Sequence, residues 1–426
     1  MKVVLIYLPH PYLNQPDAQA PMGLMYLASV LEQANHKVEI KNYSSYLTHE
    51  AIADLPEADF YGISVTSLEL PQANRFAFLV KEKYYDSVIG LGGPGTYSSE
   101  HVNWDVIDTI CIGDGEITIL DMLNDTEKCE LKKIYNGEPV PDIDIIPLPA
   151  RHLIENQGGN IFAYNKNYYE GGSSTILSSR GCPFQCAYCS APHFSVGNKR
   201  MRYRSAQSVY DEMKHVKDEY GIRQFRFSDD MFTANKQRVM EICDLVGKLD
   251  VVWRISCRVK PFDEEMAKAM FDAGCKELSF GVESFDNHVL EVLKKGATAE
   301  DNARALEITN KIGFVSRILF MIKTPGQRRE TVALNIEWLK KVPYDIIACT
   351  SYMPLPGSDI WLHPENYGIE IIDKNLDHYN FYFFGSHGEN EIRDVIRFKD
   401  RNMAEVNEET KFFRDWVKST GTVNKG

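Results

Sequence analysis

Short apolar runs alternate with segments of helical periodicity along most of the chain, and this alternation is the strongest constraint on its fold. A strand followed by an amphipathic helix and then by another strand is typical of a parallel sheet. In the first part of the chain this pattern predicts five strands, Val3–Leu8, Lys37–Lys41, Phe60–Val65, Val88–Leu91 and Thr109–Ile112. We therefore expect a doubly wound, Rossmann-like α/β sheet whose ligand lies beyond the carboxyl ends of its strands.

A second series of strands begins near Ser174, after an interruption. The interruption contains Pro139–Pro149, whose four prolines among alternating Ile and Asp predict an extended linker. Beyond it we expect six strands with helices between them, Thr175–Ser179, Gln224–Ser228, Val251–Cys257, Glu277–Gly281, Val315–Ile322 and Asp345–Thr350. Six strand–helix units predict a partial (β/α)6 barrel with its function at the carboxyl ends of the strands.

These patterns divide the 426 residues into four parts, in keeping with the two or three domains that such a length suggests. Residues 1–130 are predicted to form the Rossmann-like domain, residues 131–172 the linker and residues 173–360 the partial barrel. The strand–helix repeat fades after Trp361. We therefore expect residues 361–426 to be a short C-terminal segment that shapes the substrate site.

Composition argues against several other classes of protein. No apolar run approaches the ~20 residues that a membrane span needs, and the first residues lack the long apolar region of a signal peptide. We therefore expect a soluble, cytoplasmic protein. The formal net charge of −13 argues against a broad surface for nucleic acid. The nine cysteines are an odd number and thinly spread, which argues against a disulfide scaffold.

Three of the cysteines stand together directly after the first strand of the second series. Cys182, Cys186 and Cys189 have the spacing C-x3-C-x2-C. Thiolates at this density suit a soft metal or an iron–sulfur cluster. Three protein ligands would leave one iron of a four-iron cluster open, as in catalytic metal sites. A zinc site with three cysteines and His193 remains an alternative, because thiolate-rich sites suit either metal.

The cysteine motif, in this place within a six-fold β/α unit, resembles that of the radical S-adenosylmethionine (SAM) superfamily. The chain also contains three segments that resemble later motifs of that superfamily, Phe227–Phe232, Gly281–Ser284 and Met353–Ser358. The first sheet resembles the cobalamin-binding domain that is fused to one radical SAM class, through Pro21–Leu24, Gly92–Gly95 and Gly113–Glu116. The whole chain is thus similar to cobalamin-dependent radical SAM enzymes. Another ligand of the first domain stays open, because glycine-rich turns after strands also bind nucleotides.

The resemblance implies three cofactors and a reaction. Cys182, Cys186 and Cys189 would hold a [4Fe–4S] cluster whose open iron chelates SAM, and a reductant such as flavodoxin or ferredoxin would supply the electron that cleaves SAM to a 5′-deoxyadenosyl radical. Enzymes of this class are most often methyltransferases. The implied reaction is methyl transfer from methylcobalamin to an unactivated carbon of a small molecule or a peptide, with one SAM to remethylate cobalamin and another to supply the radical. No nucleic-acid or membrane partner is expected.

The resemblance also assigns side chains to SAM. They are Tyr188 beside adenine, Glu283 on the ribose hydroxyls, Lys295 or Lys294 on the carboxylate, Arg258 on that carboxylate or on the substrate, and Asp229 or Asp230 on the amino group. Structural roles remain as alternatives, such as a core aromatic, an exposed lysine or a helix-capping carboxylate.

In the first domain, the resemblance implies that cobalamin lies against small residues that follow the strands and beside one helix start, namely Ser64, Thr66, Ser67, Gly92, Gly93, Gly95 and Glu116. Tight turns alone would also require such residues. His10 follows the first strand, but Leu8 and Leu13 stand where the axial-histidine motif D-x-H-x-x-G has Asp and Gly. We therefore expect His10 to be a loop histidine rather than a cobalamin ligand.

Three further features allow two interpretations each. Cys349 ends the sixth strand, where it could face the barrel interior and donate hydrogen or touch substrate, although buried cysteines are usually inert. The basic run Lys199–Arg204 could bind an anionic group or form a solvated face. The aromatic segment Asp377–Gly385 could form part of a substrate lid or pack under the barrel.

Two other functions use the same motifs. A cobalamin-dependent radical enzyme could cyclise, contract or oxidise its substrate instead of methylating it, and the product mass would distinguish these outcomes. A non-catalytic cobalamin or redox sensor would form no 5′-deoxyadenosine from SAM. A cluster with an open iron argues against the sensor, because a sensor cluster is ordinarily closed by a fourth ligand.

Overall fold

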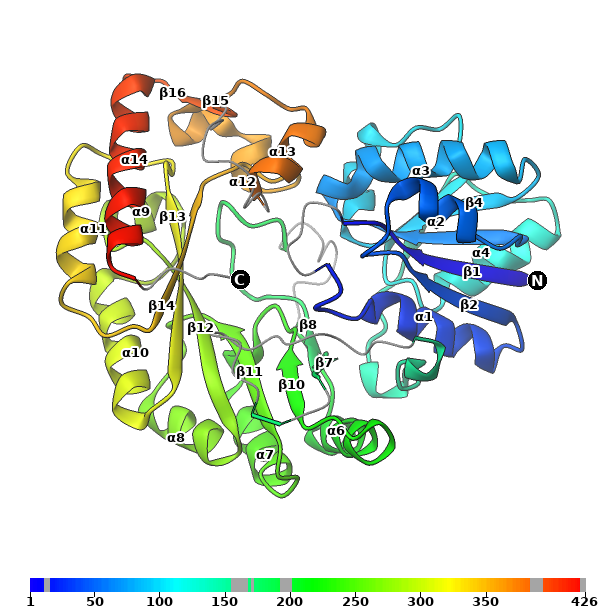
Figure 1. The fold of residues 1–426 in the computed structure, drawn as a ribbon, viewed down its shortest axis with the longest axis horizontal. Helices are drawn as coiled ribbons and strands as arrows, with labels where there is room; N and C mark the ends of the chain where they lie inside the picture. Colours follow the sequence, from blue (N-terminus) through cyan, green and yellow to red (C-terminus); the bar gives the residue numbers. More distant parts are fainter. Residues whose placement is uncertain (11–15, 155–167, 170–171, 192–200, 384–393, 422–426) are drawn as a thin grey trace. The chain divides into compact units, whose positions relative to one another are not determined.

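The computed structural model describes residues 1–10, 16–154, 168–169, 172–191, 201–383 and 394–421. These residues fall into two compact units, shown together in Figure 1. Unit 1 contains the described residues up to 154 together with residues 375–383, and unit 2 contains the others. No helix among the described residues is both long enough and apolar enough to cross a lipid bilayer.

Unit 1 is built on a six-stranded parallel sheet with the strand order β2-β1-β3-β4-β5-β6. The strands are β1 (Lys2–Tyr7), β2 (Lys37–Asn42), β3 (Phe60–Ser64), β4 (Val88–Gly92), β5 (Thr109–Gly113) and β6 (Ile134–Gly137). Both faces are apolar, because successive side chains of a strand point to opposite faces. Val4 and Ile6 pack in one core cluster, and Val3 and Leu5 pack in another.

Helices cover both faces of this sheet. Those on the face of Val4 are α2 (Thr48–Asp54) and α3 (Leu70–Lys83), and those on the face of Val3 are α1 (Met22–Gln33) and α4 (Thr118–Glu127). The doubly wound sheet expected from the sequence is therefore confirmed. Its strand order reverses between β1 and β3, which is where ligands of such sheets bind.

The predicted linker is partly wrong, because residues 131–154 belong to unit 1. Strand β6 pairs in parallel with β5, in the register Ile110 with Ile134. Ala150 and Ile154 are buried in the core cluster of Val3. Strand β6 has only four residues and lies at the sheet edge, so its sequence shows little strand periodicity. The prolines nearby favour a linker instead.

Unit 2 is built on a second six-stranded parallel sheet, in the order β14-β13-β12-β11-β10-β7. Its strands are β7 (Ser174–Ile176), β10 (Gln224–Phe227), β11 (Val252–Cys257), β12 (Cys275–Glu283), β13 (Val315–Ile322) and β14 (Ile346–Ser351). All six agree with the expected strands within a few residues. The described residues do not close the sheet into a complete barrel, because β7 and β14 remain its edges.

Helices cover one face of this second sheet, as Figure 1 shows along the outer side of the strands. They are α6 (Ala206–Tyr220), α7 (Lys236–Val246), α8 (Glu264–Asp272), α10 (Ala299–Ile312), α11 (Thr331–Leu339) and α14 (Met403–Ser419). Alternate strand residues such as Trp253 and Ile255 pack with these helices in one core cluster. We call this the helix-covered face and the opposite one the inner face.

The C-terminal residues are not a separate segment. Helix α14 places Phe413 and Val417 in the core of unit 2. Helix α13 (Leu376–Phe383) belongs to unit 1, where it contacts α3 and the 3-10 helix η1 (Ser67–Glu69). Arg75 Nη1 donates to Asp377 Oδ1 over 2.9 Å. Of the predicted aromatic segment, residues 384 and 385 lie outside the described residues.

Candidate active site

The loop that carries the three cysteines follows the short strand β8 (Ser179–Arg180). Its centre is held by backbone hydrogen bonds of Ala187, which donates to Leu293 O over 2.9 Å and accepts from Ile360 N over 3.0 Å. The Cys189 N–H donates to Cys186 O over 3.1 Å, which forms a tight turn between two of the thiols. These bonds fix the loop against the segments that follow β12 and β14, so its thiols are presented from a rigid support.

Burial raises the pKa of the Cys189 thiol to about 11, because the thiolate loses hydration, and the charges of neighbouring Cys186 and Cys182 raise it further. A cation lies beside another of the thiols. Arg258, only 8% exposed, donates from Nη1 to Cys186 Sγ over 2.9 Å, and a charge-assisted hydrogen bond favours a thiolate. Arg258 Nε is buried without a hydrogen-bond partner among the described residues.

The arrangement fits a cluster better than a single zinc ion. No three His, Cys, Asp or Glu side chains in the described part of the chain are placed to ligate one metal ion. Zinc needs its thiolates about 2.3 Å from a common point, whereas in a four-iron cluster each thiolate binds its own iron. His193, the predicted fourth zinc ligand, lies outside the described residues.

Three of the predicted SAM residues meet at the end of strand β12. Glu283 Oε1 accepts from Lys295 Nζ over 2.9 Å and from the Tyr188 hydroxyl over 3.0 Å. Lys295 Nζ also lies 3.1 Å from the Tyr188 hydroxyl. Burial raises the pKa of Tyr188 well above its usual value, and the Glu283 carboxylate adds to the effect. The other oxygen of Glu283, Oε2, accepts no hydrogen bond from the described residues and is available to a ligand.

Arg258 joins this group to the cysteine loop, because its guanidinium donates to Lys295 O as well as to Cys186 Sγ. The structure therefore brings Cys186, Arg258, Lys295, Glu283 and Tyr188 into one connected polar site. Lys294, the alternative cation, is exposed and binds Asp359 over 2.7 Å instead. That these residues bind SAM stays a prediction.

The backbone of Glu283 has a strained conformation, which orients its carboxylate toward Lys295 and Tyr188. Glu283 has φ +63°, a left-handed conformation that non-glycine residues rarely adopt. The pairing of β12 with β13 shifts register between Gly281 and Glu283. A Cβ at Gly281 would lie 2.6 Å from Glu283 Oε1 and 2.8 Å from Lys295 Nζ. A side chain at position 281 would therefore displace both charged groups.

Buried amides hold the strained turn in place. Asn335 Oδ1 accepts from Ser284 Oγ over 3.1 Å and from Phe285 N over 2.8 Å. Asn302 Nδ2 donates to Ser284 O over 3.0 Å. These two residues, from α11 and α10, were not among the predicted site residues. The contacts join positions far apart in the chain, and an Asn within a helix carries no local signal of such a role.

Asp229 holds the first strand to the second rather than presenting free oxygens. Its Oδ1 accepts from Ser178 N over 2.7 Å, and its Oδ2 accepts from Ser178 Oγ over 2.6 Å and Ser179 Oγ over 2.5 Å. Burial raises the pKa of Asp229, and these hydrogen bonds oppose the rise. Its neighbour Asp230 is exposed and is therefore the better placed of the two for a ligand amino group.

The last residue of the predicted basic run has a structural role. Arg204 is buried, with Nη1 donating to Leu177 O over 3.1 Å and to Glu212. Arg238 Nη2 donates to Ser178 O over 2.5 Å, which braces the same strand end. Lys199 and Arg200 lie outside the described residues.

Cys349 does not lie on the inner face. It packs against the core between the second sheet and its helices, on the same side of β14 as Ile347. Two residues further on, Ser351 Oγ accepts from Arg414 of α14 over 2.9 Å. The expectation that Cys349 faces the barrel interior is therefore wrong. A strand's sequence shows which residues alternate, but the sheet register decides which set faces the helices.

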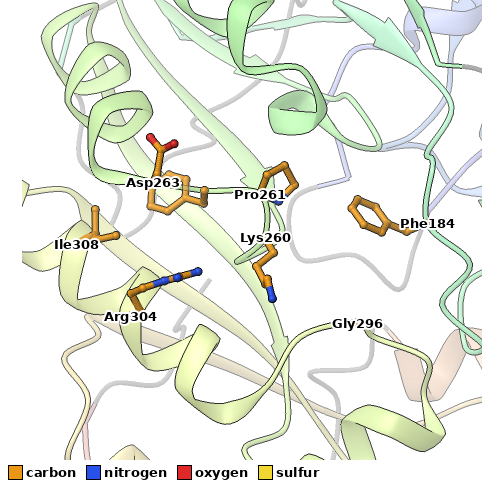
Figure 2. A pocket seen from close by; sticks show the side chains of 8 residues that line it. Phe184, Lys260, Pro261, Asp263, Gly296, Arg304 and Ile308 are labelled. Carbon is orange, nitrogen blue, oxygen red and sulfur yellow. The ribbon is translucent and has the colours of Figure 1, made fainter.

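A pocket of about 480 Å³ lies beside the cysteine loop in unit 2. Figure 2 shows Phe184, from the loop itself, across from Arg304 and Ile308 of α10. The Arg258 guanidinium lies 3.9 Å from the centre of the Phe184 ring. None of the predicted SAM residues lines this pocket, so it is separate from the Glu283 site.

In unit 1, the predicted cobalamin residues gather at the carboxyl ends of β3, β4 and β5, which are neighbours in the sheet. The turns after β3 and β4 pack closely, because a Cβ at Gly95 would lie 2.5 Å from Thr66 O. Ser67 Oγ lies 3.5 Å from Ser98 Oγ. A Cβ at Gly92 would meet no atom within 4 Å. This edge therefore has compact turns and open space at Gly92, which suits the approach of a flat ring.

The other predicted residues of this edge differ in exposure. Ser64 and Gly93 are half-buried, Thr66 is exposed and Glu116 is buried. His10 is 2% exposed, with Nε2 3.2 Å from Glu69 Oε1. Because His10 contacts the Glu69 carboxylate, its imidazole is in the setting expected of a loop histidine rather than that of a cobalamin ligand.

Comparisons with known proteins identify the family. The model of the radical SAM superfamily matches residues 176–339. An uncharacterised methyltransferase of Pyrococcus horikoshii is 32% identical over 364 residues, which cover 80% of this chain and 77% of that protein. The chain belongs to the radical SAM superfamily. Membership implies that the enzyme uses SAM and a [4Fe–4S] cluster, and the cysteine loop supplies thiols of the right number and spacing for that cluster.

The likeness to known proteins extends over both units. A structure of the radical SAM methyltransferase TsrM from Kitasatospora setae, with cobalamin and a [4Fe–4S] cluster bound, covers 87% of this chain and 80% of its own, with a TM-score of 0.66 and 18% identity. The anaerobic magnesium-protoporphyrin IX monomethyl ester cyclase of Rubrivivax gelatinosus is 25% identical over 412 residues, covering 89% of this chain and 72% of that protein. This radical SAM chain therefore shares its two-unit fold with a cobalamin-containing methyltransferase.

Proposed function

We propose that the chain is a cobalamin-dependent radical SAM methyltransferase that methylates an unactivated carbon of a small molecule or a peptide. One observation carries the proposal. Cys186, Arg258, Lys295, Glu283 and Tyr188 form a continuous chain of polar contacts at the carboxyl end of the second sheet. Metal-binding, cationic and carboxylate groups are thus within reach of one charged ligand such as SAM.

Each residue of this site has a task that its geometry supports. The three cysteines would hold the cluster, and the Arg258 guanidinium stabilises the Cys186 thiolate. Glu283 Oε2 would accept from ribose hydroxyls, while Lys295 would balance a ligand carboxylate or the Glu283 charge. When bound, the cluster and SAM would supply the radical chemistry that removes hydrogen from the substrate. A one-electron donor such as flavodoxin or ferredoxin is part of the proposal.

Unit 1 is proposed to bind cobalamin, the source of the methyl group. The support is the fold shared with TsrM and the open space at Gly92 beside the compact turn of Gly95. Ser64, Thr66, Ser67, Gly93 and Glu116 line the same edge of strand ends. His10 already contacts Glu69, so the proposed binding does not use His10 as an axial ligand.

A second function remains a candidate because a relative with 25% identity over 89% of this chain is a cyclase. Cyclisation, ring contraction or oxidation would use the same cluster and SAM site and would differ in the fate of the substrate radical. The product mass separates the two functions, because methylation adds one methyl group or several and oxidation removes hydrogens.

The test is anaerobic reconstitution with iron, sulfide and cobalamin, followed by incubation with SAM and a low-potential reductant. We expect bound iron, bound cobalamin, and both 5′-deoxyadenosine and S-adenosylhomocysteine as products of SAM. Formation of 5′-deoxyadenosine without S-adenosylhomocysteine, in the presence of bound cobalamin, would support the second function. A protein that binds cobalamin but cleaves no SAM would contradict both and favour a sensor.

A further inference from the structure

The inner face of the second sheet carries an unusual group of charges. Arg226 on β10, Arg254 on β11, Glu277 on β12 and Arg317 on β13 alternate with residues of the helix-covered core, which places all four on the inner face. In the sheet register Arg226 pairs with Arg254, and Arg254 pairs with Glu277. Glu277 pairs with Val315, two residues before Arg317. Four neighbouring strands thus bring three arginines and one glutamate together.

Only one of the three arginines is neutralised. Arg254 Nη1 donates to Glu277 Oε1 over 2.9 Å, and both residues are at least nine-tenths buried. Arg226 and Arg317 form no hydrogen bond or ion pair with the described residues, and Arg317 Nε is buried without a partner. Two positive charges are therefore left among the described residues of this face, in a chain whose net charge is −13.

The uncompensated charges have a cost in the folded protein. Burial lowers the pKa of Arg226 to about 10, and the charges of Arg254 and Arg317 contribute to the fall. The side chain is still charged at neutral pH. Like charges held together away from water are unfavourable unless an anion joins them. These charges destabilise the folded protein at the centre of the sheet, where an apolar residue would pack without this electrostatic cost.

At β10 and β13 the inner face is also less covered than the face opposite, whereas the inner residues Arg254 of β11 and Glu277 of β12 are buried. Along β13 the helix-covered residues Ser316, Ile318, Phe320 and Ile322 are buried, whereas the inner residues between them are only partly buried. On β10, Arg226 is half-buried between buried Phe225 and Phe227. Solvent, and therefore a ligand, has access to Arg226 and Arg317.

We propose that Arg226 and Arg317 bind an oxyanion of the substrate, a carboxylate or a phosphoryl group, on the inner face below the SAM site. This inference rests on the proposed function, because it takes the inner face to be the substrate's place. Guanidinium groups bind such oxyanions by paired, charge-assisted hydrogen bonds. Arg254 is already paired with Glu277 and is therefore not assigned to the anion.

The distance along the strands limits the shape of the substrate. Arg226 lies three residues before Asp229, and Arg317 lies five residues before the end of β13. At 3.2–3.4 Å per residue, the backbone of Arg226 stands about 10 Å from that of Asp229, and the backbone of Arg317 about 16–17 Å from the end of β13. The reacting carbon must be near those ends, so the substrate is elongated, with its anionic group remote from the carbon that reacts.

The experiment measures anion binding by the reconstituted enzyme with SAM at saturation and no reductant, so that the SAM carboxylate site is already filled. Isothermal titration calorimetry at constant ionic strength measures the binding of three probes. They are methylphosphonate, acetate and the uncharged dimethyl methylphosphonate. We expect one or both anions to bind and the ester not to bind. A response to methylphosphonate alone indicates a phosphoryl substrate, and one to acetate alone a carboxylate.

Variants assign the binding to the arginines. Arg317→Gln and Arg226→Gln are each expected to weaken anion binding about tenfold or more, since a charged hydrogen-bond pair is lost. Arg317→Lys should lose less, because it keeps the charge. The matched control is Arg223→Gln, on the segment just before β10, where Arg223 pairs with Asp250. Iron content and circular dichroism show whether each variant is folded.

Three results would overturn the inference: no anion binding by the native enzyme, equal binding of the uncharged ester, or full binding in a folded Arg226→Gln, Arg317→Gln double variant. SAM binding is measured separately in the same preparations. Intact SAM binding without anion binding rejects the oxyanion site and leaves the proposed function standing. Absence of SAM binding by the native enzyme rejects the proposed function itself.

Discussion

The two units contain sheets of the same size and strand direction but differ in how the chain winds around them. In unit 1 the strand order reverses at β1, and helices cover both faces. In unit 2 the strands follow one another in order, and the helices of the described residues cover one face. A sheet with two apolar faces can offer a ligand only its edge of strand ends. The second winding leaves a face that can carry polar side chains such as Arg226 and Glu277.

The chemistry of each unit follows from this difference. The candidate site of unit 1 is made mainly of turns and small residues, where compact backbone such as that at Gly95 decides what can approach. The candidate site of unit 2 is made of charged and metal-binding side chains, of which Cys186, Glu283 and Lys295 are less than a tenth exposed. Substitutions should therefore act through chemistry in unit 2 and through packing in unit 1.

The largest effect is expected from Cys186→Ala in unit 2. Removal of one of three thiolates leaves the cluster with two protein ligands, so bound iron and 5′-deoxyadenosine formation should fall to background. Iron analysis and chromatography of the products measure both. The control is Cys129→Ala, because Cys129 is exposed and lies in unit 1. Full iron and SAM cleavage in a folded Cys186→Ala protein would show that the cysteine loop does not hold the cluster.

A smaller effect is expected from Glu283→Gln. The substitution keeps the shape of the side chain but removes the charge that accepts from Lys295 and Tyr188. Loss of a charged hydrogen-bond acceptor should weaken SAM binding by about 10- to 100-fold, or about 1.4–3 kcal/mol. Equilibrium binding of SAM measures the change, with iron content expected to be unaltered. Glu307→Gln, on the exposed side of α10, is the matched control. Native SAM affinity in Glu283→Gln would remove Glu283 from the site.

The same contrast explains how much of the molecule could be predicted. The strands of unit 2 were found from residues such as Phe225 and Trp253, whose burial follows local periodicity. The cysteines, Glu283 and Lys295 were named from a motif resemblance, and the structure brings Glu283 and Lys295 together. Neither signal depends on long-range contacts.

What escaped prediction depends on contacts between distant positions. Strand β6 can be recognised as a strand only from its pairing with β5 in the structure. The face on which Cys349 lies is set by the register of β14 with β13. The Arg226 and Arg317 group requires four strands to be aligned first, because 91 positions separate the two residues along the chain. A single sequence contains no local signal for any of these.

In unit 1, a pair of glycine substitutions tests whether packing is the deciding factor. Gly95→Ala places a Cβ 2.5 Å from the backbone oxygen of Thr66, which cannot move without shifting the turn after β3. We expect a loss of about 1–3 kcal/mol in the free energy of unfolding. Gly92→Ala, where the Cβ meets no atom within 4 Å, should change it by less than about 0.5 kcal/mol. Denaturant titration measures both, and equal stabilities would show that the two turns are not closely packed.

The smallest expected effect is a pH dependence at His10, which is also in unit 1. Burial lowers the pKa of His10 below its usual 6.5, although Glu69 and the Pro9 backbone oppose the fall. The folded protein then loses the proton at a lower pH than the unfolded chain does. Between those two pKa values the unfolded chain binds more protons, so the free energy of unfolding falls as the pH is lowered.

A single proton limits the slope of this dependence to about 1.4 kcal/mol per pH unit. His10→Gln removes the titrating group and can still donate to Glu69, so its stability should vary less than that of the native protein below pH 6.5. Denaturant titrations of both proteins between pH 5 and pH 8 give the difference. Parallel curves would mean that His10 is not shielded from water. The edge of strand ends in unit 1 would then be more open to water than its turns suggest. Close packing would then distinguish unit 1 less clearly from the charged site of unit 2.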